Sequence, residues 1–299
     1  MTCDLTNPAF SDETKAREFL EASRWPDGAV CPDGHPGWLN EKRKIFECPN
    51  GHQWSVTSGT VMHRTKLPLH IWFWAAYLVT TNTPGMSAKG FAKQLDLHYE
   101  TAYMLLQKLR AAMVNPERGM IGGAVEMDEA FVSGGRSAES AKGVLAVVLA
   151  AVEVKKDNRA GRVRLQVSPS NRTQDLVKFL RANVEEGSTV ITDGNTAYKR
   201  IEGFGYSHVV EEMDVDYRLP HIHRVFSNLK AWLIGTHHGV SHKHLQAYLN
   251  EFAFRFNRRK VPMAAFQTVL GLGTKVQGPT YEGIFKGGYV HPNRGKATK

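Results

Sequence analysis

Residues 125–132 read Val-Glu-Met-Asp-Glu-Ala-Phe-Val, a pattern that predicts a β-strand with an acidic side chain inside it. A carboxylate at Asp128 is costly in so apolar a strand unless a metal ion or a cationic group lies beside it. Side chains alternate along a strand, so Glu126 shares the face of Asp128 while Glu129 points the other way. We therefore expect a metal ion or a cation beside Asp128, with Glu126 able to assist.

This strand begins a series of alternating strand and helix signals. Strands are expected at 124–132, 143–154, 162–167, 188–192 and 206–210. Helices are expected at 173–184, 196–201, 220–234 and 241–258. Three strands followed by helix, strand, helix, strand and helices are the order of the RNase-H-like α/β fold. The sequence therefore predicts an RNase-H-like domain over residues 124–260.

A second carboxylate, Asp193, directly follows the buried strand that ends in Val190-Ile191-Thr192. Ligands collect at strand ends in α/β sheets, and two carboxylates on adjacent strands can bridge a pair of divalent metal ions. Hydrolysis and transfer of phosphodiesters need such ions, because one activates the attacking oxygen and the other stabilises the leaving oxygen. The alternative is that Asp193 is only a turn residue in Thr-Asp-Gly-Asn.

Two segments near the N-terminus repeat one pattern, Cys31-Pro-Asp-Gly-His35 and Cys48-Pro-Asn-Gly-His52. Each supplies a thiolate and an imidazole around a tight turn, and two such pairs suit a tetrahedral, structural zinc ion. The expected ligands are Cys31, His35, Cys48 and His52. Zinc would supply much of the folding free energy of a region with little core of its own. The alternative is two buried cysteines and two surface histidines.

The next part of the chain predicts a helix at 67–79 and then two helices joined by a short break, at 87–95 and 99–113. Ser87 is a plausible N-cap, and the pair fits a helix-turn-helix whose second helix enters the major groove of DNA. The side chains expected nearest the bases are Tyr99, Thr101 and Tyr103 (with Glu100). Those expected to meet phosphates are Lys89, Lys93, Lys108 and Arg110. An ordinary helical hairpin with a solvated basic face is the alternative.

The bulk composition favours a globular partner of a polyanion. The 299 residues carry a formal net charge of +9, and 42% of them are hydrophobic, which excludes a disordered chain. Three cysteines cannot make a disulfide framework, and no apolar run is long enough to span a membrane. We expect a cytoplasmic, nucleoid-associated protein without a signal peptide. The expected domains are a zinc ribbon (1–65), a helix-turn-helix region (66–114), the RNase-H-like domain (124–260) and a C-terminal extension (261–299).

Taken together, these segments resemble bacterial insertion-sequence transposases that join an N-terminal zinc ribbon to an RNase-H-like catalytic domain. The segments that carry the resemblance are 57–69, 125–129, 192–194, 220–230, 235–245 and 254–259. They run through nearly the whole chain in the family's order. The resemblance implies a DDE-type active site, a divalent metal ion (Mg²⁺ or Mn²⁺), the terminal repeats of double-stranded DNA as substrate, and a homo-oligomer on DNA.

The resemblance also assigns site residues. The family's first two acids fall on Asp128 and Asp193, and its third acid, usually Glu, lies seven residues before a Lys. Counting back from Lys230 reaches His223, so this chain reads Asp-Asp-His followed by Lys. His223 and Lys230 are about 20° apart around a helix and face one side, with Lys230 expected to position a DNA phosphate. Asn228 is the other candidate for the third ligand, and Glu251 a distant one.

Three other functions fit part of the sequence. A DNA-binding regulator with an inactive catalytic domain would leave the retention of both Asp128 and Asp193 unexplained. A site-specific nuclease without strand transfer, such as a resolvase, is the second; serine or tyrosine recombinases would need a covalent nucleophile, and no Ser or Tyr here has a convincing Arg cluster. A structural nucleic-acid protein that relies on charge alone would explain neither the alternating strands nor the buried acids.

Overall fold

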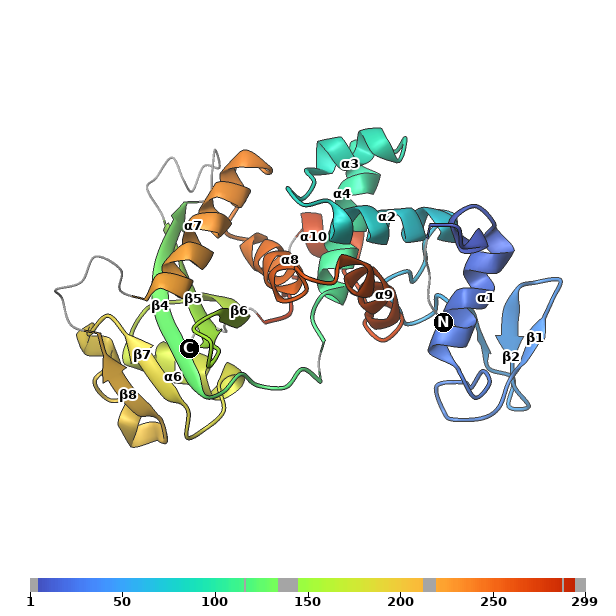
Figure 1. Cartoon of the computed structure of the whole chain (residues 1–299). Coiled ribbons are helices and arrows are strands. Elements are labelled where there is room, and N and C mark those ends of the chain that lie inside the picture. Colours follow the sequence, from blue (N-terminus) through green and yellow to red (C-terminus); the bar gives the residue numbers. More distant parts are fainter. Residues whose placement is uncertain (1–4, 116, 134–144, 212–218, 287, 294–299) are drawn as a thin grey trace. The chain divides into compact units, whose positions relative to one another are not determined.

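The computed structural model describes residues 5–115, 117–133, 145–211, 219–286 and 288–293, and Figure 1 shows the whole chain. The chain forms two compact units. The first unit comprises residues 1–115 and 260–289, and the second comprises residues 116–259 and 290–299. Each unit is described here by itself.

The first unit opens with the short helix η1 (Pro8–Phe10) and helix α1 (Glu13–Arg24), which the sequence analysis did not anticipate. The Asp12 side chain caps α1 by accepting a hydrogen bond from the backbone N–H of Lys15 at 3.0 Å. An antiparallel sheet of short strands follows, made of β1 (Trp38–Asn40), β2 (Ile45–Glu47) and β3 (Gln53–Trp54). Of the two Cys-Pro-x-Gly-His segments, Cys31–His35 precedes β1 and Cys48–His52 connects β2 to β3.

Helices make up the rest of the first unit. They are α2 (Leu69–Thr81), α3 (Ala88–Gln94), α4 (Tyr99–Ala112), α9 (Pro262–Gly273) and α10 (Tyr281–Phe285). Ser87 caps α3 as expected, because its Oγ accepts a hydrogen bond from Gly90 N at 3.1 Å. The turn between α3 and α4 includes Asp96 at a φ of +50°.

Helix α9 belongs to the core of the first unit, although it lies in the segment expected to be a C-terminal extension. The Phe266 ring stacks on Phe10 at a centroid distance of 5.6 Å and meets Tyr77 edge-on at 6.0 Å. Phe266 itself is fully buried. Residues 260–289 therefore complete a fold whose other residues lie nearly 150 positions or more earlier in the sequence.

The second unit is built on a five-stranded sheet with the order β6-β5-β4-β7-β8. Its strands are β4 (Ala124–Ser133), β5 (Leu145–Val154), β6 (Ala160–Ser168), β7 (Thr189–Thr192) and β8 (Ser207–Val210). The first three strands pair antiparallel, whereas β7 runs parallel to β4 and β8 parallel to β7. This topology is that of the RNase-H-like fold, as the sequence predicted.

Helices cover both faces of this sheet, as Figure 1 shows, and each face has its own core. The helices are α6 (Thr173–Asn183), α7 (Pro220–Gly235) and α8 (Leu245–Asn257), with the short turns η2 (Thr196–Tyr198) and η3 (Ile201–Phe204). Alternate residues of β4 divide between the two cores: Ala130 and Val132 pack with α7 and α8, whereas Val125 and Met127 pack with α6. Glu126 and Asp128 therefore lie on the α7 face and Glu129 on the α6 face.

The expected elements of the second unit agree with the observed ones to within a few residues at most ends. Residues 143–144, which begin one expected strand, lie outside the described residues. The expected helix at 241–258 begins later, at Leu245. No helix among the described residues is long and apolar enough to cross a membrane.

Candidate functional site

Asp128 is an acidic side chain near the middle of β4, with only 14% of its side chain exposed. Its Oδ1 accepts a hydrogen bond from the backbone N–H of Glu129 at 2.8 Å. The pKa of Asp128 is raised to about 7, chiefly by burial and also by the charges of Asp193 and Glu129, whereas the N–H of Glu129 and the charge of Lys230 act in the opposite direction. Asp128 therefore lies in a site where negative charge is in excess.

Asp193 follows β7, the strand beside β4. Glu126 pairs with Ile191 across the two parallel strands, so two residues later Asp128 and Asp193 stand at the same level of the sheet. The chain turns away at Gly194, whose φ is +83° and where a Cβ atom would come within 2.8 Å of the Val210 side chain. This turn leaves the Asp193 carboxylate exposed at the edge of the site.

Helix α7 brings two more polar side chains to this edge. The Nε2 atom of His223 lies 3.5 Å from Oδ2 of Asp128, and 56% of the His223 side chain is exposed. Lys230 is exposed on the same helix, and its charge acts on Asp128. Asn228, the other candidate for the third ligand, is also exposed on α7, whereas Glu251 is fully buried on α8 and lies 3.6 Å from Arg255. The structure thus brings His223 into contact with Asp128.

Glu126 holds the first turn of α7 against β4. The N-cap residue Leu219 has a φ of +47° and provides no side-chain cap, so the helix begins with unsatisfied N–H groups. The buried Glu126 accepts a hydrogen bond from the backbone N–H of Ile222 at 2.8 Å, and burial raises its pKa. This contact fixes the position of His223 relative to Asp128. The shared face of Glu126 and Asp128 was predictable, but the capping of a helix almost a hundred residues away was not.

The donor set suits a hard divalent cation. The carboxylates of Asp128 and Asp193 repel each other. Burial, together with this repulsion, raises the pKa of Asp128. A divalent cation between them would relieve the repulsion, and carboxylate oxygen is the ligand that Mg²⁺ and Mn²⁺ favour. A neutral imidazole such as His223 can add a nitrogen ligand, which suits Mn²⁺ better than Mg²⁺.

The first unit contains a second cluster of metal-binding side chains. Single ligand atoms of Cys31, His35, Cys48 and His52 all lie within 4.8 Å of one another. A tetrahedral ion with Zn–S bonds near 2.3 Å and Zn–N bonds near 2.0 Å needs ligand separations of about 3.3–3.8 Å. The four side chains therefore stand in the arrangement that a zinc ribbon requires.

The two halves of this cluster share one backbone conformation. In the first, Cys31 N donates to His35 O at 2.9 Å and Gly34 has a φ of +83°; in the second, Cys48 N donates to His52 O at 3.2 Å. Burial alone would raise the pKa of the Cys31 thiol, but hydrogen bonds from His52 and His35 lower it to about 6. A thiolate is thus available to a metal ion near neutral pH.

The predicted DNA-contacting residues divide into two groups. Lys89, Lys93 and Tyr99 are exposed, and Thr101 and Tyr103 are half-buried. The rings of Tyr99 and Tyr103 stack at a centroid distance of 6.2 Å along the first turns of α4. These side chains are therefore accessible on α3 and on the start of α4.

Two basic residues of α4 face inward instead. Lys108 donates to the backbone oxygen of His63 at 3.1 Å, and burial lowers its pKa. Arg110 is only 1% exposed, so the expectation that it meets a DNA phosphate is wrong. The two residues lie about 200° apart around the helix, and both are covered because the C-terminal half of α4 is buried on most sides.

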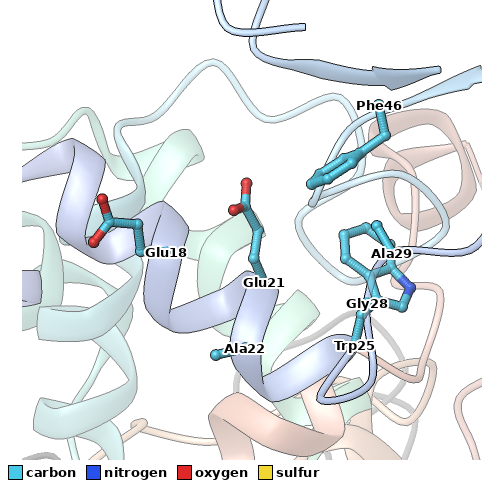
Figure 2. A pocket seen from close by; sticks show the side chains of 7 residues that line it. All are labelled: Glu18, Glu21, Ala22, Trp25, Gly28, Ala29 and Phe46. Atoms are coloured by element: carbon cyan, nitrogen blue, oxygen red, sulfur yellow. The ribbon is translucent and has the colours of Figure 1, made fainter. Parts of the chain in front are cut away.

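A shallow pocket of about 330 Å³ lies beside α1, lined by two glutamates and two aromatic rings. Figure 2 shows Glu18 and Glu21 projecting from α1, and the rings of Trp25 and Phe46 close together. The two carboxylates form ion pairs with Lys15 and Arg17. The charges of the two glutamates are thus balanced by neighbouring cations, and the pocket carries no part of the candidate site.

Comparison with known proteins finds a similarity that is confined to the second unit. Residues 120–257 match the family model of the ISXO2-like transposase domain. This part of the chain is therefore similar to the ISXO2-like transposase domain. The match covers less than half of the 299 residues, and all of it falls in the second unit. No curated protein matches the chain.

Among solved structures, the catalytic core domain of BIV integrase aligns with a TM-score of 0.27 and 16% sequence identity. The alignment covers 50% of this chain and 81% of that one. Within the transposase domain, all four residues predicted to carry the chemistry, Asp128, Asp193, His223 and Lys230, fall inside the matched residues.

Proposed function

We propose that this chain is a DDE-type transposase, which binds the terminal inverted repeats of its own insertion sequence, cleaves a DNA strand there and joins it to a target. The observation that carries the proposal is that Asp128 lies in β4 and Asp193 directly follows the parallel neighbour β7, both within the residues similar to the ISXO2-like transposase domain. Such a domain implies a divalent metal ion. Asp128 and Asp193 are the carboxylates that would hold it.

The metal ions would activate the attacking oxygen and stabilise the leaving oxygen of the scissile phosphodiester. The protein's own part is to present the carboxylates in a fixed geometry. Asp128 is held in β4 by the sheet and by the N–H of Glu129, and burial limits its motion. Asp193 is exposed, and can reach both the ion and solvent water.

We assign the third ligand to His223 and the binding of a DNA phosphate to Lys230. His223 already contacts Asp128 at 3.5 Å, and its exposed side chain can turn toward an ion without displacing the core. Lys230 lies two helical turns further along α7 and stays exposed, so its ammonium group can pair with a phosphate oxygen. The assignment of Asn228 to the third role has no comparable contact in its favour.

Recognition of the DNA ends falls to the first unit in this proposal. Its zinc ribbon would keep a small sheet folded, and α4 would enter the major groove with Tyr99, Thr101 and Tyr103 toward the bases. Lys89 and Lys93 on α3 would bind phosphates. Cleavage of both ends followed by joining requires two active sites, so we expect a homo-oligomer on the DNA.

A second candidate function is a DNA-binding regulator derived from a transposase, without catalytic activity. The observation in its favour is His223 at the position where the family usually has Glu. An imidazole is a poorer ligand for Mg²⁺ than a carboxylate, and this substitution could lower or abolish cleavage.

One experiment separates the two functions. The full chain is incubated with duplexes carrying the element's ends, with Mg²⁺, with Mn²⁺ or with no divalent ion, and the strands are resolved on a denaturing gel. A transposase yields metal-dependent nicks at the element boundary and joined products. A regulator retards the same duplexes but leaves every strand intact.

The aspartates supply the matched controls. Asp128→Ala and Asp193→Ala should each lower cleavage by more than about a hundredfold, because even partners outside the ligand shell contribute 10–100-fold. Binding to the ends should change little, since the DNA interface lies mainly elsewhere. Cleavage near the parent rate in either variant would refute the assignment.

A further inference from the structure

Glu129 is the neighbour of Asp128 in β4, but its side chain lies on the α6 face of the sheet. Three neutral donors surround its carboxylate. Tyr198 donates its hydroxyl to Oε2 at 2.5 Å, and Oε1 accepts from the side-chain amides of Asn171 at 3.0 Å and Asn195 at 3.2 Å. Charge-assisted hydrogen bonds of this kind are among the stronger ones in proteins.

One of these donors leads directly to Asp193. The backbone N–H of Asn195 donates to Oδ1 of Asp193 at 3.0 Å, while the Asn195 side-chain oxygen caps η2 by accepting from Ala197 N at 3.1 Å. Asn195 therefore uses its amide nitrogen to bind Glu129, its side-chain oxygen to start the next turn, and its backbone to hold the aspartate.

Glu129 also acts on the other aspartate, because its own backbone N–H donates to Oδ1 of Asp128 at 2.8 Å. A continuous path of hydrogen bonds thus joins the two carboxylates through Glu129 and Asn195. The path matters most for Asp193, which is exposed on the turn after β7 and has no sheet pairing of its own to fix it.

We propose that Glu129 is a positioning residue that fixes the separation of Asp128 and Asp193 by anchoring the Asp193 turn through Asn195. The inference rests on the proposed function, in which these aspartates bind divalent ions. Both Glu129 oxygens are already occupied by donors on the α6 face, so Glu129 is a support for the ligands and not a ligand itself. Preformed ligands bind more tightly, because less conformational entropy is lost when the ion enters.

Tyr198 is the most deeply buried of the three side chains that donate to Glu129. It is fully buried, and burial together with the charge of Glu129 raises the pKa of its phenol far above the ordinary value. The hydroxyl therefore stays protonated and remains a donor. Tyr206 offers a matched comparison, because it is a buried tyrosine in the same core whose hydroxyl donates to the backbone oxygen of Val184 at 3.3 Å.

The test uses Mn²⁺ binding to the full, zinc-loaded chain, followed by the paramagnetic resonance signal of free Mn²⁺, with no DNA present. Asn195→Asp keeps the oxygen that caps η2 but replaces the donor to Glu129 by a second negative charge. It should weaken Mn²⁺ binding about tenfold, the effect expected of an outer-shell partner. Tyr198→Phe should weaken it in the same direction, and Tyr206→Phe should leave it unchanged.

A compensating variant makes the test specific. In the Glu129→Gln/Asn195→Asp double variant the amide and the carboxylate exchange places, so the hydrogen bond between the two positions is restored. Binding of Mn²⁺ should return to within about threefold of the parent, which a general loss of stability would not allow. Thermal unfolding of each variant confirms that the chain is folded.

Two results would overturn the inference. One is parent-like Mn²⁺ affinity in both Asn195→Asp and Tyr198→Phe, and the other is a double variant no better than Asn195→Asp alone. Failure of the proposed function looks different, because the parent itself would then bind Mn²⁺ no better than Asp128→Ala does.

Discussion

Asp128 is a largely buried acidic residue whose pKa is shifted by its surroundings. Burial, with a smaller contribution from the charge of Asp193, raises the pKa of Asp128 to about 7. A carboxyl group with a raised pKa holds its proton longer in the folded chain than in the unfolded chain. Its contribution to the free energy of unfolding therefore falls as pH rises from about 4 to about 7, by up to about 1.4 kcal/mol per pH unit.

This sign predicts a pH-dependent effect of Asp128→Asn. In buffer freed of added divalent ions by a resin, which leaves bound zinc in place, the variant should unfold at a higher temperature than the parent at pH 8. At about pH 2.5, well below the ordinary Asp pKa, Asp128 is protonated in both states and the difference should vanish. Adding Mn²⁺ at pH 8 should stabilise only the parent. Thermal melts at the two pH values check this, and equal melting of the two proteins at pH 8 would contradict it.

His223 allows a prediction about the choice of metal ion. Since an imidazole suits Mn²⁺ better than Mg²⁺, cleavage should be faster with Mn²⁺ than with Mg²⁺. His223→Ala should lose cleavage, whereas His223→Glu should keep it and shift the preference toward Mg²⁺. Asn228→Ala is the matched control on the same helix. Normal cleavage by His223→Ala beside an inactive Asn228→Ala would move the third role to Asn228.

At the scale of elements, hydrophobic periodicity predicted the strands and helices of the second unit because most of them bury one face locally. The pattern of β4 also predicted which face Glu126, Asp128 and Glu129 would take. Other features depend on contacts between distant residues and have no local signature. The cap that Glu126 provides for α7 and the anchoring of Asn195 by Glu129 are of this kind.

Helix α9 shows a second reason why part of the fold could not be predicted from the sequence. Helix α9 has an apolar sequence opened by Pro262, but the Gly-, Lys- and Pro-rich residues that follow it resemble a loosely structured tail. Its apolar side is covered by Phe10 and Tyr77, which no pattern within α9 could indicate. The division into a zinc ribbon, a helix-turn-helix region and a C-terminal extension stays a prediction. Residues of all three share one compact unit.

The paired Cys-Pro-x-Gly-His turns predict one bound zinc ion per chain. Elemental analysis of the purified protein should find it, and the Cys31→Ser/Cys48→Ser variant should have lost it along with part of the stability of the small sheet. The core there consists of little more than Phe46, Trp54 and the two cysteines, so it has few other contacts to rely on. Zinc retained in full by that variant would rule out this site.

The two exposed lysines of α3 predict a measurable salt dependence. Replacing both, as Lys89→Ala/Lys93→Ala, should weaken binding to the DNA ends and lower the slope of log affinity against log salt by about two. Lys155→Ala/Lys156→Ala, which removes the same charge from an exposed turn of the second unit, is the control. An unchanged slope in the first variant would exclude α3 from the phosphate contacts.

At the scale of the whole molecule, we propose that the first unit recognises the DNA ends and that the second unit binds the divalent ions. The first unit has the Cys/His cluster and the accessible face of α3 and α4, and the second has the acidic site and the residues similar to the ISXO2-like transposase domain. The charge of +9 belongs to a chain that must approach a polyanion, yet the site itself is negative. A divalent cation is what would reconcile an acidic site with a phosphodiester substrate.

Iron-directed cleavage of the protein tests that central claim most directly. Fe²⁺ takes the place of Mg²⁺ in the full chain, and peroxide with ascorbate then generates radicals that cut the backbone next to the bound ion. The account predicts cuts near Asp128, Asp193 and His223 that excess Mg²⁺ suppresses and that the Asp128→Ala/Asp193→Ala variant lacks. Cuts that are confined to residues 31–52, or that persist unchanged in that variant, would contradict it.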